Sequence, residues 1–152
     1  MAHIHEQIDW TVAVFIVHGD KVLLRMHEKY HLWLGVGGHI ELDEDPLQAA
    51  HRECMEEVGL DIKVHGEDQL TFYEEDRLQE LPRPASMNIH KVNETHQHID
   101  VIYYATCEHT NIVPENPTDT WQWLTKEELE QQDDILESVK IRALEALQTF
   151  SS

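Results

Sequence analysis

Basic residues are scarce in this sequence, and that scarcity limits the partners the chain can have. The 152 residues include 11 Lys and Arg against 30 Asp and Glu, a formal net charge of −19 at pH 7. Such a charge repels nucleic-acid backbones and anionic lipid surfaces, so we expect neither as a partner. An anionic substrate would be repelled as well, unless a bound divalent cation reverses the local field.

Cysteine and long apolar runs are also nearly missing. Cys54 and Cys107 are too few for a disulfide framework and suit a reducing compartment, with a single structural pair as the alternative. No segment reaches the length of a membrane span. Residues 1–10 lack the basic and apolar stretches of a secretory signal. We therefore expect a cytoplasmic protein.

The rest of the composition is that of a folded domain. Apolar residues make up 41% of the chain and aromatic residues 7%, which excludes a disordered tail. A chain of 152 residues is long enough for a core of its own. No internal repeat, low-complexity segment or linker divides it. We therefore expect one domain that spans residues 1–152.

Strand patterns occur in both halves of the chain. β-Branched and aromatic runs predict a hairpin around Gly19 and further extended segments, at residues 11–18, 21–25, 61–73, 99–106 and 121–124. Gly35, Gly37 and Gly38 predict a loop whose backbone approaches another group closely. Charge and proline predict longer loops at residues 74–85 and 111–120.

Helix signals separate these strands. Asp43 or Asp45 can cap a helix that has Pro46 in its first turn, runs to about Val58 and ends at Gly59. A second helix is expected after Thr125, because Glu128 follows at the spacing of a capping box. The last helix is amphipathic and is expected to contain Ile135, Val139, Arg142, Leu144 and Leu147. Strands and helices in this order predict a layered α/β or α+β domain.

Three glutamates lie on one face of the first predicted helix. Glu53, Glu56 and Glu57 have the spacing i, i+3, i+4, so their side chains converge. Carboxylates this close repel one another, and a hard divalent cation with oxygen ligands would offset that repulsion. The helix alone leaves a second interpretation open, a solvated acidic face.

The residues around this helix match a longer pattern. Gly38 is followed by five residues and Glu44, then by seven residues and Arg52-Glu53, and the run ends at Glu56-Glu57-Val58-Gly59-Leu60. This stretch resembles the signature of the Nudix hydrolase family at all seven of its glycine and charged positions. Two departures are Cys54, where the family prefers an aliphatic residue, and Val36, where it usually has proline. Neither change removes a polar group.

The resemblance implies a fold and a reaction. The fold is an α/β/α sandwich with a mixed central sheet. The reaction is Mg²⁺-dependent hydrolysis of a diphosphate linkage in a nucleotide-like substrate, with Mn²⁺ as a substitute metal. The resemblance places the metal on Glu53, Glu56, Glu57 and the carbonyl of Gly38, and it makes Arg52 and the three glutamates the catalytic group. Glu44 would form a salt bridge with Arg52, and Gly37 would support the site.

Other roles stay open at this stage. The general base could be Glu53, or it could come from outside the signature, from Glu94, Glu115 or Asp119. Arg25 could contact a phosphate, or it could be a surface arginine without a partner. The substrate could be a nucleoside triphosphate, a sugar nucleotide, a dinucleoside polyphosphate or a diphosphate without a nucleoside. Members of the family are often dimers, so a homodimer is expected.

Histidines form a second group of candidates. His96, His98 and Asp100 alternate, so on a strand they share one face and could bind a transition metal. Some Nudix proteins have a similar stretch, and there a substrate-pocket role is expected, above all for His98. Packing or surface exposure is the interpretation favoured for the group, ahead of a substrate contact and of a second metal site. His3 and His5 lie near the start of the chain, where we expect disorder.

Three rival functions fit parts of this pattern. A nucleotide sensor on the Nudix scaffold would bind without cleaving, and a degraded signature would favour it. An isomerase of isoprenoid diphosphates resembles the fold but typically lacks the intact signature. An acidic metal-buffering or interaction protein would bind divalent ions without needing the glycines. The complete signature favours the hydrolase over all three.

Overall fold

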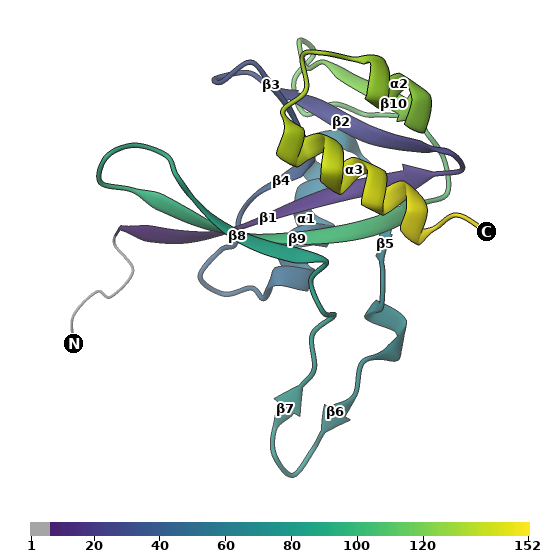
Figure 1. Cartoon of the computed structure of the whole chain (residues 1–152). Coiled ribbons are helices and arrows are strands. Elements are labelled where there is room, and N and C mark those ends of the chain that lie inside the picture. Colours follow the sequence, from purple (N-terminus) through teal and green to yellow (C-terminus); the bar gives the residue numbers. More distant parts are fainter. Residues whose placement is uncertain (1–6) are drawn as a thin grey trace.

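The computed structural model describes residues 7–152, so the expectation for His3 and His5 lies outside the described residues. An eight-stranded mixed sheet forms its centre (Figure 1). Its strands are β1 (Ile8–His18), β2 (Lys21–His27), β3 (Leu32–Leu34), β4 (Val36–His39), β5 (Ile62–Val64), β8 (Ser86–Lys91), β9 (Gln97–Cys107) and β10 (Trp121–Thr125). The main order is β10-β2-β1-β9-β5, with β3 beside β2, β4 beside β1 and β8 beside β9.

One parallel pair makes the sheet mixed. β1 and β9 run side by side from Ile8 opposite Gln97 to Val17 opposite Thr106, and every other pair in the sheet is antiparallel. The other edge of β1 is shared, since its first half pairs with β4 and its end pairs with β2. This sharing brings the glycines of β4 into the middle of the sheet.

Helices cover both faces of the sheet, as the predicted α/β/α sandwich requires (Figure 1). The helices are α1 (Pro46–Val58), α2 (Lys126–Gln131) and α3 (Glu137–Thr149). Side chains alternate between the faces of a strand. The even-numbered apolar residues of β1, such as Val14, pack in the buried cluster that contains Cys54 of α1, whereas Phe15 and Val17 pack in the cluster that contains Ala143 of α3.

The ends of α1 follow the sequence signals. Asp45, not Asp43, is the N-cap: its side chain accepts from the backbone N–H of Gln48, and the Gln48 side chain accepts from Asp45 in return. Pro46 occupies the first turn, and Gly59 ends the helix in the left-handed conformation at φ 69°. The predicted capping box of α2 is also present at Thr125 and Glu128.

Four expectations for local structure need correction. The glycine segment is not all loop, because residues 36–39 form β4 and hydrogen-bond to β1. Ile135 is buried but precedes α3. Residues 61–73 are extended only in β5 and in β6 (Phe72–Tyr73), with a 3-10 turn between them. The expected loop after them contains β7 (Leu78–Gln79), which pairs with β6 in a hairpin that extends away from the sheet (Figure 1).

Two strands, β3 and β8, were not predicted at all. Both strands are short, and β8 is mostly exposed although Met87 and Ile89 alternate with polar residues. Pairing with β2 holds β3 in the sheet, and pairing with β9 holds β8. Both cysteines are free thiols, and Cys54 is buried in the core. Among residues 7–152, no helix combines the length and the apolar character that crossing a membrane would need.

Candidate active site

Glu57 lies at the centre of the site. It projects from the last turn of α1 toward the sheet, where its side chain is 12% exposed. The backbone N–H of Gly37 donates to its Oε2 at 3.4 Å, and Nη1 of Arg25 lies 3.4 Å from the same oxygen. Burial raises the pKa of Glu57 to about 8; Arg25 opposes this shift, and the charge of Glu53 adds to it.

Glu53 lies one helical turn earlier, directly against Gly38. A Cβ atom on Gly38 would lie 2.6 Å from Oε1 of Glu53, closer than two such atoms can approach. The missing side chain therefore lets the carboxylate reach the strand. The Glu53 side chain is 12% exposed, and burial raises its pKa while Arg52 opposes the rise. Two largely buried carboxylates thus lie one helical turn apart on α1.

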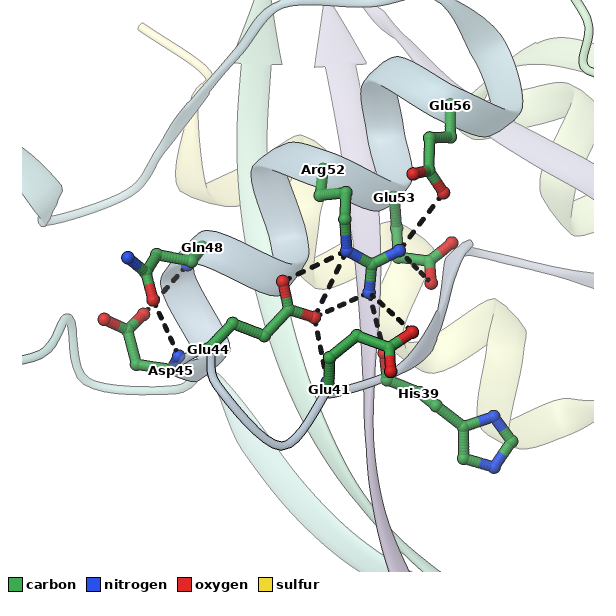
Figure 2. A network of polar contacts seen from close by, with 8 residues as sticks. All are labelled: His39, Glu41, Glu44, Asp45, Gln48, Arg52, Glu53 and Glu56. Atoms are coloured by element: carbon green, nitrogen blue, oxygen red, sulfur yellow. Dashed lines mark hydrogen bonds and ion pairs between the residues drawn. The ribbon is translucent and has the colours of Figure 1, made fainter.

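Arg52 holds the surrounding loop and two of the glutamates in place (Figure 2). Its Nε and Nη2 donate to the carboxylate of Glu44 at 3.0 and 2.6 Å, which confirms the predicted salt bridge. Nη2 also donates to the carbonyl of His39 at 2.9 Å. Nη1 donates to Glu53 at 3.0 Å and to Glu56 at 3.1 Å. The hydrogen bonds from Arg52 lower the pKa of Glu44.

These contacts use the whole guanidinium group. An arginine has five N–H donors, one on Nε and two on each terminal nitrogen. Here Nε donates to Glu44, and Nη2 donates to Glu44 and to the His39 carbonyl. Nη1 donates to Glu53 and Glu56. Glu56 differs from the other two glutamates because its side chain is 53% exposed. It therefore faces the solvent side of the site.

A buried ion pair connects the site to the loop before β10. Nη2 of Arg25 lies 3.1 Å from Oδ2 of Asp119, whose side chain is 1% exposed. Burial alone would raise the pKa of Asp119, but the N–H of Asn116 and the guanidinium of Arg25 outweigh it, and the pKa falls. Arg25 thus lies between two carboxylates, those of Glu57 and Asp119, rather than on the surface.

The donor atoms of the site fit a divalent metal ion. Carboxylate oxygens and a backbone carbonyl are the ligands that Mg²⁺ prefers. Burial disfavours the charged forms of Glu53 and Glu57, and a bound cation would favour them. Two buried polar atoms beside them, Nε of Arg25 and Oδ1 of Asp119, have no hydrogen-bond partner. A site with polar groups left unpaired is suited to a charged ligand.

Not all of the remaining candidate residues from the sequence lie near this site. The backbone N–H of Glu115 donates to the carbonyl of Glu57 at 3.1 Å, so the loop that carries Glu115 is attached to the end of α1. Glu94 lies in the connection between β8 and β9, on no element of this site. The strand registers place His98 and Arg25 on opposite faces of the sheet. Sequence reasoning gave no signal for the pairing of Arg25 with Asp119.

The fold and this site define a class of protein, a hydrolase of diphosphate linkages built on the Nudix scaffold. The family model described as NUDIX domain matches residues 8–147. The structure is similar to that of a Nudix-family hydrolase from Clostridium perfringens, with 35% sequence identity, a TM-score of 0.85, and coverage of 94% of this chain and 98% of the other. The chain belongs to the Nudix family.

Two more distant structures share the fold. A MutT Nudix hydrolase from Burkholderia pseudomallei has 18% identity and a TM-score of 0.63, with 96% of this chain and 100% of that chain covered. An ADP-ribose pyrophosphatase from Streptococcus suis has 16% identity and a TM-score of 0.61, with 95% and 92% covered. At this level of identity the similarity concerns the fold alone.

Proposed function

We propose that this chain hydrolyses the P–O–P linkage of a nucleoside diphosphate derivative or nucleoside triphosphate with the help of Mg²⁺. The observation that carries the proposal is the pair of buried carboxylates, Glu53 and Glu57, on the glycine backbone of β4. Burial raises the pKa of both carboxylates although Arg52 and Arg25 lie beside them, so a divalent cation would stabilise the pair in its charged form.

The metal ligands in this proposal are Glu53, Glu56, Glu57 and the carbonyl of Gly38. Mg²⁺ bound there, or Mn²⁺ in its place, would neutralise diphosphate oxygens and lower the pKa of a bound water. The net charge of −19 repels an anionic substrate, and the bound cation would supply a local positive charge that attracts it. Phosphoryl transfer depends mainly on such positioning and charge stabilisation.

The protein's own residues have distinct roles in this scheme. Arg52 has no N–H left for a substrate, so we assign it to positioning: it fixes Glu53 and Glu56 and ties Glu44 to the carbonyl of His39. Arg25 favours the charged form of Glu57. Asp119 in turn holds Arg25 in place. As an alternative to binding the metal, Glu53 is our candidate for the general base, since burial raises its pKa and so makes it a stronger base than an exposed glutamate.

A substrate panel tests the proposal. The purified protein is incubated with nucleoside triphosphates, sugar nucleotides, dinucleoside polyphosphates and a diphosphate without a nucleoside, each with and without Mg²⁺, and the phosphate-containing products are identified. We expect cleavage only with Mg²⁺, and the preferred member of the panel identifies the substrate class. Saturable nucleotide binding without cleavage under any condition would instead favour a sensor.

Replacing Gly38 with alanine is expected to damage the site and spare the fold. The new Cβ would meet the end of the Glu53 side chain, which can rotate away, and no backbone atom is among its three nearest neighbours. We expect Gly38→Ala to keep its melting temperature within a few degrees and to bind Mg²⁺ at least about tenfold more weakly, since a ligand is displaced. Calorimetric titration with Mg²⁺ and thermal unfolding measure the two effects. A variant that unfolds, or one that binds Mg²⁺ normally, would contradict this description of Gly38.

Mg²⁺ is expected to stabilise the folded protein more at pH 8 than at pH 6. The pKa of Glu57 is about 8 in the fold and lies near 4.3 in an unfolded chain. Between these values the folded state binds more protons, so the free energy of unfolding of the metal-free protein falls as pH rises through this range. Mg²⁺ needs the deprotonated carboxylate, and protons compete with it less at pH 8.

Thermal unfolding with and without Mg²⁺ at both pH values measures this difference. The Glu57→Gln variant is the control, because an amide cannot titrate, and it should lose most of the pH dependence of the Mg²⁺ effect. An equal or larger Mg²⁺ effect at pH 6 would show that Glu57 does not exchange a proton for the metal.

A further inference from the structure

Polar side chains from four neighbouring strands meet on the face of the sheet opposite the glutamates. The registers place Asp9 of β1 opposite His98 of β9, His98 opposite His90 of β8, and Thr11 of β1 opposite His39 of β4. Along β1 this is the face of Phe15 and Val17, which pack in the cluster with α3. Toward the start of β1 the residues on this face are no longer apolar, and histidines occupy it instead.

His98 lies at the middle of this group. Its ring makes edge-on contacts with three other imidazoles, with centroid distances of 5.0 Å to His39, 5.5 Å to His90 and 5.3 Å to His96. Asp9 supplies the only carboxylate that pairs with these rings in the described residues, with Oδ2 at 3.5 Å from Nε2 of His39 and at 2.9 Å from Nε2 of His96.

Three of these residues have the geometry of a metal site. One ligand atom each from Asp9, His39 and His98 lie within 4.8 Å of one another. Bonds of about 2.0–2.2 Å to Zn²⁺ place tetrahedral ligands about 3.3–3.5 Å apart. The separation of 3.5 Å between Asp9 and His39 already meets this value. The ligand atom of His98 lies within 4.8 Å of the other two, so its side chain would have to move closer to bind the same ion. Nε2 of His96 lies 2.9 Å from Oδ2 of Asp9 and orients this carboxylate, as outer partners of metal ligands do.

We propose that Asp9, His39 and His98 form a binding site for a borderline transition-metal ion of the Zn²⁺ class. Imidazole nitrogens with one carboxylate select such ions over Mg²⁺, which prefers oxygen ligands. The site is open to solvent, because the side chains of His39 and Asp9 are 58% and 41% exposed. Three protein ligands leave a fourth position for water or for another ligand.

This site is separate from the glutamate site although the two are adjacent in sequence. Gly38 faces Glu53, so the next residue of β4, His39, projects to the other face of the sheet. Figure 2 shows the His39 ring directed away from Glu44 and Arg52. The backbone joins the two sites, since the carbonyl of His39 accepts from Arg52 at 2.9 Å. Gly38 is the only proposed Mg²⁺ ligand that is adjacent to His39 in the sequence.

Co²⁺ is a suitable probe, because it replaces Zn²⁺ and its visible absorption intensifies in a four-coordinate site with nitrogen ligands. The full-length protein is titrated with Co²⁺ in excess Mg²⁺, which keeps the oxygen-ligand site filled. We expect saturation near one equivalent, intense visible absorption and displacement by Zn²⁺. His39→Gln, His98→Gln and Asp9→Asn should each weaken binding by at least about tenfold.

Three controls separate this site from others. His109→Gln alters an exposed histidine outside the group, and the double variant His3→Gln/His5→Gln tests the start of the chain; both should bind Co²⁺ normally. Glu57→Gln should also retain the absorption. His39→Gln changes an exposed side chain and should fold, so it tests the site even if His98→Gln fails to fold. Absence of saturable absorption, unchanged binding in His39→Gln, or loss of binding in a control variant would overturn the proposal.

Discussion

Glu57→Gln is expected to lower kcat by about a thousandfold or more while leaving the protein folded. A metal ligand contributes several kcal/mol of charge stabilisation in the transition state, and each 1.36 kcal/mol corresponds to about a tenfold change in rate. Glutamine keeps the shape of the neutral carboxyl group that burial already favours at this position. Steady-state kinetics with the preferred substrate, at saturating Mg²⁺, measure the change.

The matched control is Glu130→Gln, which makes the same chemical change on the exposed surface of α2. It should leave kcat unchanged. Without Mg²⁺, the Glu57→Gln variant should melt no lower than the original protein, because burial already favours the neutral form of Glu57 and Arg25 keeps Asp119 as a charged partner. Turnover that survives in Glu57→Gln would show that the metal is held elsewhere. A large fall in melting temperature would show that the main role of Glu57 is to stabilise the fold.

Gly37→Ala is expected to have the largest effect on stability. A Cβ on Gly37 would lie 1.8 Å from the carbonyl oxygen of Val12 and 2.9 Å from Cα of Ala13. Both atoms belong to the backbone of β1, which pairs with β4 on this edge and with β9 on the other, so neither can move without disturbing the sheet. Overpacking a core typically costs about 1–3 kcal/mol, and contact with fixed backbone places this case at or above the top of that range.

Chemical unfolding measures this loss of free energy, and for a chain of this length we expect a fall in melting temperature of roughly 10 °C. Gly38→Ala is the control, since the two residues are adjacent and the substitution is the same. It should unfold at nearly the original temperature, because its new methyl group meets only a flexible side chain. Equal destabilisation of the two variants would contradict the register that separates Gly37 from Gly38.

Local sequence patterns were enough to predict α1 and the residues it carries. Asp45, Pro46 and Gly59 fix the ends of this helix through interactions within a few residues of each end. Once the helix is known, the spacing of Glu53 and Glu57 places them on the same side, and Arg52 can reach back to Glu44. These are short-range relations, and the ordinary geometry of a helix determines them.

Partners distant in sequence could not be predicted in this way. Arg25 and Asp119 are 94 residues apart, and they meet because β10 follows Asp119 and pairs with β2, which places Trp121 opposite Arg25. The glycines were expected in a loop, because glycine lacks strand propensity; it is the pairing with β1 that makes β4 a strand. Alternation predicted a shared face for His96 and His98, but only the sheet register adds Asp9 and His39 to that face.

In the proposed reaction, the protein uses water to break a diphosphate linkage at phosphorus. The most direct test of this reaction is to run the substrate panel in water labelled with heavy oxygen and to identify the products by mass spectrometry. We expect two phosphate-containing products, one of which carries a single labelled oxygen on phosphorus, and no product when Mg²⁺ is withheld. Intact substrate throughout the panel, or products without label on phosphorus, would contradict the assignment of this chain's site to hydrolysis.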